Sequence, residues 1–307
     1  MHLPPIRQLQ YLIALGDTLH FGKAAESLHV TQSTLSTGIK ELENTLGVTL
    51  VERSKKSVAF TEVGRALLEN CRKILIQYES LVNQAREFQD PLHIPFRIGA
   101  IPTIAPYLMA DFVARVRKKL PDIKLYIREN TTGNLLLELN DGKLDLILIA
   151  FPYDTENLET RIMYREGLHL VHSSAEKTVK GTSIDFNQIP NESLLLLDDG
   201  HCLRDHALSG CKLKSDKKIH TFGANSLQML IQMVDNNLGM TFVPDMAINA
   251  GVLERTQTRT VRLPATQFYR DIGFAWRKDN YRHNKLLELI SCLTGKTSQK
   301  GNQKQLP

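Results

Sequence analysis

Apolar residues recur every three or four positions through the first part of the chain, which is the spacing of one face of a helix. Between Arg7 and Thr61 this pattern predicts three short helices, over residues 7–15, 21–28 and 32–46. Thr31 can cap the third helix through its hydroxyl oxygen, and Gly47 is the residue type that commonly ends a helix. The small pair Ala24 and Ala25 would let another helix approach the second one closely. The pattern therefore predicts a compact helical domain at the start of the chain.

The third predicted helix has two chemically different faces. Its apolar stripe consists of Leu35, Ile39, Leu42 and Leu46. The opposite face carries short hydrogen-bonding side chains and one cation, and such groups can reach base edges and phosphates in the major groove. These candidate DNA-binding residues are Gln32, Ser33, Ser36, Thr37 and Lys40.

A basic hairpin is expected directly after this helix. Residues 48–60 are consistent with two short strands around a basic turn, and Arg53, Lys55 and Lys56 would contact backbone phosphates there. The alternative is an amphipathic helix pair that binds nothing. The order of small pair, tight turn, polar face and basic hairpin favours a winged helix-turn-helix DNA-binding domain over residues 1–61.

A long helix is predicted over residues 62–90, capped by Thr61. Its apolar positions alternate spacings of four and three, which is a heptad pattern typical of a two-stranded coiled coil. We therefore expect a dimerisation helix, although a single helix of this kind could pack on its own domain. Pro91 and Pro95 should end the helix and form a hinge. The apolar seam consists of Leu67, Cys71, Ile74, Tyr78, Leu81, Ala85 and Phe88.

The pattern changes to alternating strands and helices over residues 91–294. Strands are expected at 96–100, 123–127, 144–149, 194–197, 241–243 and 272–275, and helices at 105–119, 132–141, 225–237 and 284–293. This alternation predicts an α/β fold with a parallel sheet covered on both faces, long enough for two lobes with a cleft between them. Ligands in such sheets bind beyond the carboxyl ends of the strands. Thr103 and Thr132 follow the first two strands, where they could hold a small polar ligand or simply cap helices. Residues 295–307 are polar and are expected to form a disordered tail.

Composition narrows the setting of the protein. Apolar runs of about 18 residues are absent from the sequence, and the first residues lack the pattern of a secretory signal. Four cysteines without such a signal favour a reducing, cytoplasmic location without contact with a membrane. The formal net charge of +5 permits contact with nucleic acid but does not require it. A nucleotide-binding loop, a catalytic triad and a paired-carboxylate site are not evident, so we expect neither an enzyme nor a cofactor.

The N-terminal features resemble the LysR-type transcriptional regulators. The segments that carry the resemblance are residues 21–36, 46–48 and 50–53, and the likeness extends from about Pro5 to Leu293. The resemblance implies a homotetramer built from two dimers, and a two-lobed effector domain similar to periplasmic binding proteins. It implies double-stranded promoter DNA and RNA polymerase as partners. Ser33 stands where the family usually has proline, and Thr37–Gly38 also departs from the common pattern, which leaves the operator sequence open.

A second resemblance points to the members of this family that sense hydrogen peroxide. Residues 200–205 and the pair Gly210–Cys211 resemble the redox loop of these sensors. This implies that Cys202 reacts with hydrogen peroxide and that Cys211 then forms a disulfide with it. The residues that would bind or activate peroxide by the same match are Thr103, Thr132, His201, Arg204, Asp205 and Arg270.

The chemistry of Cys202 agrees with this role. A thiolate attacks peroxide, and the neighbouring potential cations His201 and Arg204 are expected to lower the pKa of the cysteine. Cys211 follows nine residues later. If the segment is helical, the two Cα atoms lie roughly 13 Å apart at ~1.5 Å per residue. A disulfide needs about 4.4–6.8 Å, so a helical segment would have to refold before the bond could form. We therefore predict that the reduced segment is at least partly helical.

Several alternatives remain at this point. The cysteines could be buried packing residues, which is the expectation for Cys71 and Cys292. The chain could instead sense a metabolite in the cleft between the lobes, or reduce peroxide as an enzyme. A metal site is a further possibility, although its spacing matches no common zinc pattern. Its ligands would come from His201, Cys202, His206, Cys211 and His220.

Overall fold

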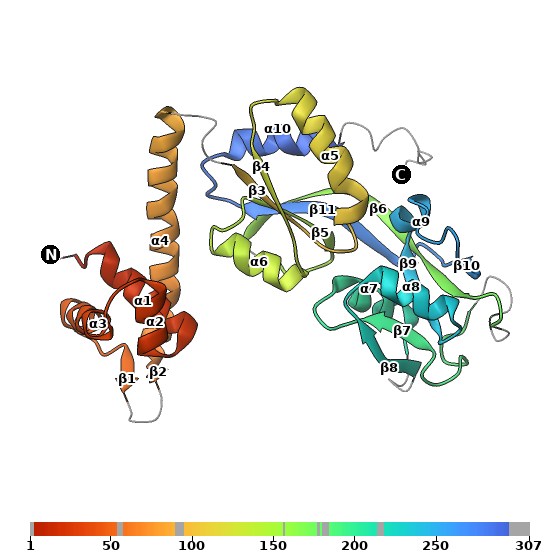
Figure 1. Cartoon of the computed structure of the whole chain (residues 1–307), viewed down its shortest axis with the longest axis horizontal. Helices are drawn as coiled ribbons and strands as arrows, with labels where there is room; N and C mark the ends of the chain where they lie inside the picture. Colours follow the sequence, from red (N-terminus) through yellow and green to blue (C-terminus); the bar gives the residue numbers. More distant parts are fainter. Residues whose placement is uncertain are drawn as a thin grey trace. The chain divides into compact units, whose positions relative to one another are not determined.

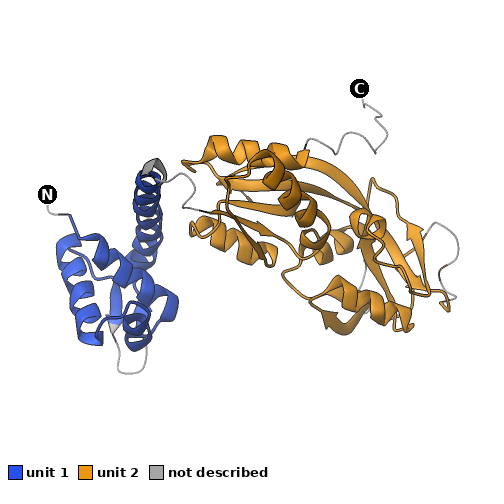
Figure 2. Cartoon of the chain, turned by 45° about the horizontal axis from the view of Figure 1, so that its top comes forward, with its two compact units in different colours: residues 1–93 blue, residues 94–307 orange. Residues whose placement is uncertain are grey.

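The computed structural model describes residues 3–53, 58–89, 95–155, 157–176, 179, 184–213 and 218–294. The chain divides into two compact units, residues 1–93 and 94–307, which are considered separately (Figure 2). Lys55, Lys56, Pro91 and the tail 295–307 lie outside the described residues. The domain boundaries, the hinge and the disordered tail that were expected from the sequence therefore stay predictions.

The first unit begins with three helices packed around one core (Figure 1). These are α1 (Ile6–Thr18), α2 (Phe21–Ser27) and α3 (Gln32–Leu46). Thr31 caps α3 by accepting a hydrogen bond from the Thr34 amide, and Gly47 ends it with a φ of 71°. Both predictions are confirmed. Leu35, Ile39 and Leu42 are buried as predicted, but Leu46 is 39% exposed because it lies at the end of the helix, past the core.

The expected hairpin and long helix follow. The hairpin consists of β1 (Val51–Arg53) and β2 (Val58–Phe60), which pair antiparallel. The helix α4 (Glu62–Gln89) begins after Thr61, whose hydroxyl accepts a hydrogen bond of 2.9 Å from the Gly64 amide.

The seam of α4 divides into two parts. Leu67 and Cys71 pack into the core of their own unit, so the packing role expected for Cys71 is confirmed. Ile74, Tyr78 and Leu81 are 49%, 45% and 63% exposed. The second part of the seam thus leaves an apolar stripe uncovered within the first unit.

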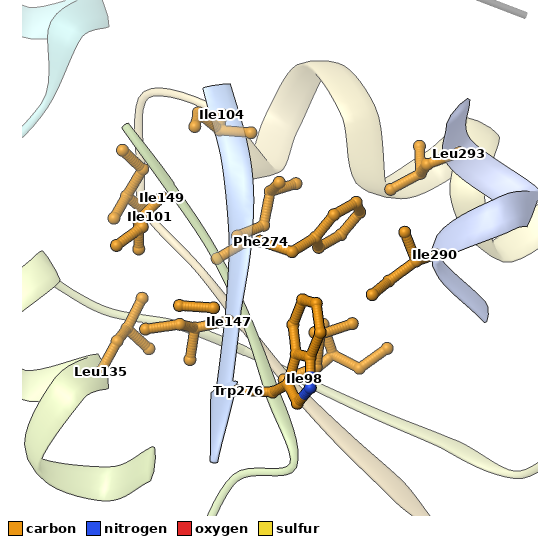
Figure 3. Close-up of a cluster of buried hydrophobic side chains, with 14 of the residues drawn as sticks. Ile98, Ile101, Ile104, Leu135, Ile147, Ile149, Phe274, Trp276, Ile290 and Leu293 are labelled. Atoms are coloured by element: carbon orange, nitrogen blue, oxygen red, sulfur yellow. The ribbon is translucent and has the colours of Figure 1, made fainter. Parts of the chain in front are cut away.

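The second unit contains one twisted sheet of mixed direction, in the order β4-β3-β5-β11-β6-β9-β7-β8, with β10 paired to β6. Its lobe around the start of the unit contains β3 (Phe96–Ala100), α5 (Ala105–Lys119), β4 (Leu125–Glu129), α6 (Thr132–Asn140), β5 (Leu146–Phe151), β11 (Tyr269–Arg277) and α10 (His283–Thr294). We call this part lobe 1. Figure 3 shows Leu135 of α6 on one side of its central strands, and Ile290 and Leu293 of α10 on the other.

Lobe 2 surrounds a separate hydrophobic core. It contains β7 (Leu194–Leu197), α7 (Cys202–Cys211), β8 (Ile219–Ala224), α8 (Leu227–Asp235), β9 (Met240–Pro244), α9 (Asp245–Asn249) and β10 (Thr258–Arg262). The 16-residue strand β6 (Leu158–Ser173) belongs to both lobes. Its first part pairs with β11, and the part from Leu168 pairs with β9 and β10.

The prediction of a parallel sheet is wrong in part. β3 is parallel to β4 and β5, but β11 and β6 run antiparallel to their neighbours. The chain returns from lobe 2 to lobe 1 through β11, and this return reverses the strand direction. The predicted strands at 123–127 and 144–149 begin and end two residues later than expected, while the strand at 96–100 and the helix at 105–119 agree with the prediction.

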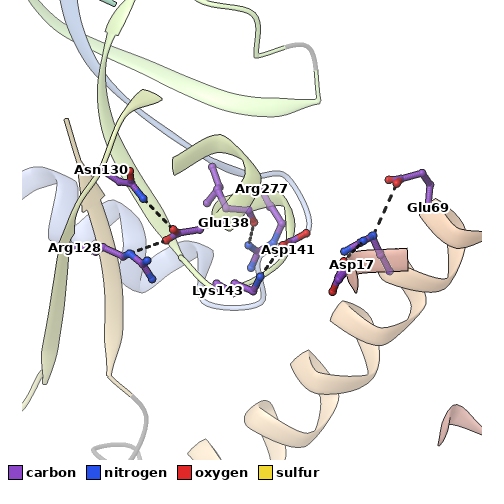
Figure 4. Close-up of polar contacts among 10 residues, drawn as sticks. Asp17, Glu69, Arg128, Asn130, Glu138, Asp141, Lys143 and Arg277 are labelled. Atoms are coloured by element: carbon purple, nitrogen blue, oxygen red, sulfur yellow. Dashed lines mark hydrogen bonds and ion pairs between the residues drawn. The ribbon is translucent and has the colours of Figure 1, made fainter. Parts of the chain in front are cut away.

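Polar side chains hold the ends of several elements in place (Figure 4). Arg277 donates to the carbonyls of Leu139 and Leu144, and so satisfies backbone groups at the end of α6 and after it. Arg128 pairs with Glu138 at 3.3 Å. Within the part of the chain that the structure describes, no helix is both long and apolar enough to cross a membrane.

Candidate functional site: a buried cysteine beside a small cavity

The helix α7 carries the two cysteines singled out by the sequence at its two ends. It begins at Cys202, after the extended residue His201, and ends at Cys211. The prediction that this segment is helical is confirmed. Both thiols are free and buried. Cys202 belongs to the core of lobe 1, whereas Cys211 belongs to the core of lobe 2.

A tight cavity lies beside Cys202, with no free volume for a water-sized molecule in this conformation. Its polar walls include Thr103, Thr132 and His201, three of the residues expected to bind peroxide. The Thr132 hydroxyl oxygen is buried and makes no hydrogen bond of normal geometry to any described residue. The full lining consists of Ile101, Pro102, Thr103, Thr131, Thr132, His201, Cys202 and Leu203.

Thr103 and Thr132 do not act as helix caps. Thr131 occupies the cap position of α6 without a side-chain hydrogen bond, and Thr132 is the first residue of that helix. The residue before α5 is Ile104, so Thr103 lies outside the cap position as well. The interpretation of Thr103 and Thr132 as helix caps is therefore wrong, and both residues line the cavity beside Cys202 instead.

Arg270 connects to this cavity through Thr103. Its side chain is fully buried, with an exposure of 0%. Arg270 Nη1 donates to Thr103 Oγ1 at 2.7 Å, and Nη2 donates to the Thr103 carbonyl at 3.1 Å. Because Thr103 Oγ1 accepts from Arg270, its own hydrogen can be donated elsewhere. This hydroxyl group would offer a hydrogen bond to a small acceptor molecule that entered the cavity.

The expected lowering of the Cys202 pKa is wrong. Burial raises the pKa of this thiol, and this effect outweighs the opposing influences of Arg270, the Thr132 hydroxyl and the Ala150 backbone. Asp205 raises it further. The cation that favours the Cys202 thiolate is Arg270, which is distant in the sequence, and not the expected neighbours His201 and Arg204.

Arg204 and Asp205 are not part of the cavity wall. Arg204 donates to the Leu197 carbonyl at 3.2 Å and pairs with Asp199 at 3.0 Å. Asp205 is exposed. Of the six residues expected to bind or activate peroxide, the structure brings three to the cavity and places Arg270 behind Thr103.

Two further buried residues lie near the site: the sequence did not point to Glu166, and it pointed to His206 only as a possible metal ligand. Glu166 pairs with Arg270, and nothing in its local sequence marks it, because the contact depends on strand pairing. His206 lies one turn after Cys202 on α7, and that spacing could have revealed it. Its Nε2 lies 3.3 Å from the Pro152 carbonyl oxygen, and its Nδ1 has no hydrogen-bond partner among the described residues.

The other end of α7 is fixed within lobe 2. Gln267 Nε2 donates to the Gly210 carbonyl at 2.6 Å. A Cβ atom on Gly210 would lie 2.4 Å from the Phe268 ring, so this position has room for glycine alone. Burial raises the pKa of Cys211 to about 12. Cys211 is therefore a thiol in this conformation, and a poor nucleophile.

The candidate DNA-binding residues lie on one helix of the first unit. Gln32, Ser33, Thr37 and Lys40 are exposed on α3, and Ser36 is half-buried. Their interaction with DNA stays a prediction, as does that of Arg53 in β1. A group of three or more histidines, cysteines and carboxylates able to hold a metal ion does not occur among the described residues. Cys292 is packed in the core of lobe 1, as expected.

Comparison with known families agrees with both units. Residues 6–65 match the bacterial regulatory helix-turn-helix protein, lysR family, and residues 90–298 match the LysR substrate binding domain. The chain belongs to the LysR family of transcriptional regulators. It is therefore a DNA-binding regulator and not an enzyme.

Curated relatives of this LysR-type regulator include two with different names. The transcriptional regulator EstR of Acinetobacter baylyi is 41% identical over 253 residues, which cover 82% of this chain and 83% of EstR. The hydrogen peroxide-inducible genes activator of Haemophilus influenzae is 37% identical over 294 residues, which cover 94% of this chain and 96% of the relative.

A solved structure extends the likeness to both units. A full-length OxyR variant from Pseudomonas aeruginosa is 32% identical to this chain, with a TM-score of 0.67, and the match covers 95% of this chain and 98% of that one. The expected fold, a winged helix-turn-helix followed by a two-lobed α/β domain, is confirmed.

Proposed function

We propose that this regulator senses hydrogen peroxide through Cys202 and Cys211. The observation that carries the proposal is the placement of a buried thiol beside a tight cavity with hydroxyl groups in its wall. Cavities that bind metabolites usually measure about 300–1,000 Å³, whereas this cavity has no free volume for a water-sized molecule in this conformation. Its walls would have to shift slightly to admit peroxide and much further to admit a metabolite, which favours the smaller molecule. The name of the Haemophilus relative supports the same signal.

The proposed reaction begins at the Cys202 sulfur. Its thiolate attacks one oxygen of hydrogen peroxide, the O–O bond breaks, and Cys202 becomes a sulfenic acid. The departing hydroxide takes up the proton released by the thiol and leaves as water. Thr103, whose oxygen accepts from Arg270, would donate its hydrogen to the peroxide. Arg270 favours the thiolate by its charge.

The second step joins Cys202 to Cys211. The Cys211 sulfur attacks the sulfenic sulfur, the S–O bond breaks, a second water leaves, and a disulfide forms. The helix holds the two Cα atoms roughly 13 Å apart at ~1.5 Å per residue. A disulfide requires about 4.4–6.8 Å, so α7 has to unwind first. Oxidation would thereby replace the helix with another local structure and change the surface around it.

The output of this change would be altered DNA binding by an assembly of several subunits. We propose that α3 enters the major groove of promoter DNA, and that Arg53, Lys55 and Lys56 contact phosphates. The exposed residues Ile74, Tyr78 and Leu81 would pair two chains through α4. Two such dimers would form a homotetramer in the cytoplasm, with RNA polymerase as a further partner.

Mass spectrometry after addition of one equivalent of hydrogen peroxide tests the proposal. Trypsin cleaves after Arg204, so Cys202 and Cys211 fall on different peptides, and a disulfide would link the two. We expect the linked pair in the wild-type protein, and none in Cys202→Ser or Cys211→Ser. Cys292→Ser should behave like the wild type. Free thiols after treatment, with unchanged promoter binding, would overturn the peroxide-sensing proposal.

A second candidate is a LysR-type regulator that responds to a metabolite bound between the lobes. The relative EstR supports this candidate, because it is 41% identical and its name does not mention peroxide. Cys202→Ser separates the two functions. It should abolish the response to peroxide in the first case, and leave the response to the true inducer intact in the second.

A further inference from the structure

Glu166 and Arg270 form a buried ion pair across two strands. They lie directly opposite each other in the pairing of β6 with β11. Arg270 Nε donates to Glu166 Oε1 at 2.7 Å, and their side chains are 0% and 3% exposed. The second carboxylate oxygen, Oε2, accepts from the Met246 amide at 2.9 Å. Burying such a pair is costly unless its hydrogen bonds are satisfied, and here both carboxylate oxygens have partners.

The guanidinium uses its remaining nitrogens on one residue of the cavity wall. Nη1 and Nη2 of Arg270 donate to the hydroxyl and carbonyl oxygens of Thr103. A continuous chain of contacts therefore runs from Met246 through Glu166 and Arg270 to Thr103, which lines the cavity beside Cys202.

We propose that Glu166 is a positioning residue for the peroxide reaction, which fixes the Arg270 guanidinium against Thr103 and neutralises part of its charge, and so restrains the reactivity of Cys202. This inference rests on the proposed function of Cys202 but concerns a different residue. Glu166 acts through Arg270 and does not touch the cavity. It sets how strongly the cation favours the thiolate.

The electrostatic reason is direct. A guanidinium group is charged in proteins, and the charge of Arg270 favours ionisation of Cys202. An adjacent carboxylate reduces that influence, because its negative charge opposes the effect of the guanidinium on the Cys202 thiol. Tyr107 of α5 and Tyr164 of β6 interact electrostatically with both Arg270 and Glu166. Cys202 and His206 of α7 interact with Arg270. The carboxylates that act on these four groups besides Glu166 are Asp205, Asp245 and Asp271.

The rate of Cys202 alkylation by iodoacetamide, followed by mass spectrometry from pH 5.5 to 10, tests the proposal without any peroxide. Glu166→Gln removes the charge and keeps the size of the side chain. We expect the apparent pKa of Cys202 to fall by about one unit, and alkylation at pH 7 to be roughly three- to tenfold faster. Arg270→Gln should move the apparent pKa in the opposite direction.

Glu166→Asp distinguishes charge from packing. It shortens the side chain and disturbs the hydrogen bonds, but keeps the carboxylate. If Glu166 serves packing alone, Glu166→Asp should change the pH profile of alkylation more than Glu166→Gln does. Our proposal predicts the opposite, with the profile of Glu166→Asp closer to that of the wild type. Glu254→Gln, which removes an exposed carboxylate from lobe 2, is the matched control and should leave the profile unchanged.

Glutamine can satisfy only one of the two donors that Glu166 accepts from, so Glu166→Gln could fail to fold. Near-ultraviolet circular dichroism of the lone tryptophan, Trp276, reports this. In that case the comparison of Arg270→Gln with the double variant Glu166→Gln/Arg270→Gln carries the test. The double variant should have the lower apparent pKa, because it lacks the remaining negative charge.

An unchanged or raised apparent pKa in Glu166→Gln, or in the double variant relative to Arg270→Gln, would overturn the role of Glu166. That result leaves the peroxide-sensing proposal standing if the disulfide between Cys202 and Cys211 still forms. If the disulfide fails to form in the wild-type protein but the pKa shifts occur, the electrostatic role holds and the peroxide signal does not.

Discussion

Cys202 and Cys211 are the first and last residues of one helix, yet each is packed in the hydrophobic core of a different lobe. Bringing their sulfurs together therefore requires more than the unwinding of α7, because at least one thiol has to leave its core. The stability of the docked helix opposes formation of the disulfide. Interactions that hold α7 in place should set how readily the protein responds to oxidant.

The hydrogen bond from Gln267 to the Gly210 carbonyl is one such interaction. Gln267→Ala should weaken the docking of α7 by about 1 kcal/mol, which corresponds to roughly fivefold faster closure of the disulfide once Cys202 is oxidised. Quenched-flow alkylation with mass spectrometry measures this rate. Gln228→Ala, at an exposed position of α8, is the control. Equal rates in both variants would show that the end of α7 does not limit closure.

Acid should loosen the same helix through His206. Burial lowers the pKa of this imidazole from its ordinary value of 6.5, so the unfolded chain takes up the proton more readily than the folded protein. The stability contributed by the neutral ring is complete above about pH 6.5 and is lost as the pH falls further. Urea midpoints at pH 7.5 and 5.5 should differ less for His206→Gln than for the wild type. His283→Gln, at a half-exposed position, should retain the wild-type difference.

Dimerisation through α4 predicts a sensitive position at Leu81, which is 63% exposed in the single chain. A carboxylate there would be buried without a partner in a coiled coil, so Leu81→Asp should yield mainly monomers. Sedimentation velocity measures the change. Asn83→Asp introduces the same charge on the opposite face of the helix and should leave the assembly intact. A stable dimer of the Leu81 variant would move the interface elsewhere.

Lys40 on α3 should contribute to DNA affinity mainly by releasing counterions. Replacement of one phosphate-contacting lysine weakens binding about equally for all sequences, and lowers the slope of log affinity against log salt by about 1. Lys40→Ala in a promoter-binding titration at several salt concentrations gives this slope. Lys118→Ala removes an exposed cation from α5 in the other unit, and its slope should match the wild type.

The sequence was sufficient for the local parts of this molecule. The cap at Thr31 and the end at Gly47 follow from the chemistry of nearby residues. The helix at 202–211 was expected only from the argument about the distance between its two cysteines. Thr103 and Thr132 could be found because residues at the ends of parallel strands meet at one edge of a sheet. These features depend on contacts within a few residues, or on a simple alternation of elements.

The missing parts depend on contacts between distant segments. The first part of β6 carries polar residues on both faces of the strand. Its sequence therefore lacks the alternation of apolar and polar residues that predicts a strand. Without that strand, the pairing of Glu166 with Arg270 cannot be foreseen. The direction of the Cys202 pKa shift was mistaken for the same reason, since burial by residues far along the chain outweighs the charges of its sequence neighbours.

The continuity of β6 through both lobes has a mechanical consequence. Its backbone is hydrogen-bonded to β11 in one lobe and to β9 and β10 in the other, so rotation of one lobe against the other has to bend this strand near Leu168, where its partners change. A binding protein that closes like a clamp around a metabolite needs such a bend. Release of α7 needs no such bend, so oxidation would change the shape of the surface while β6 and both lobes stay in place.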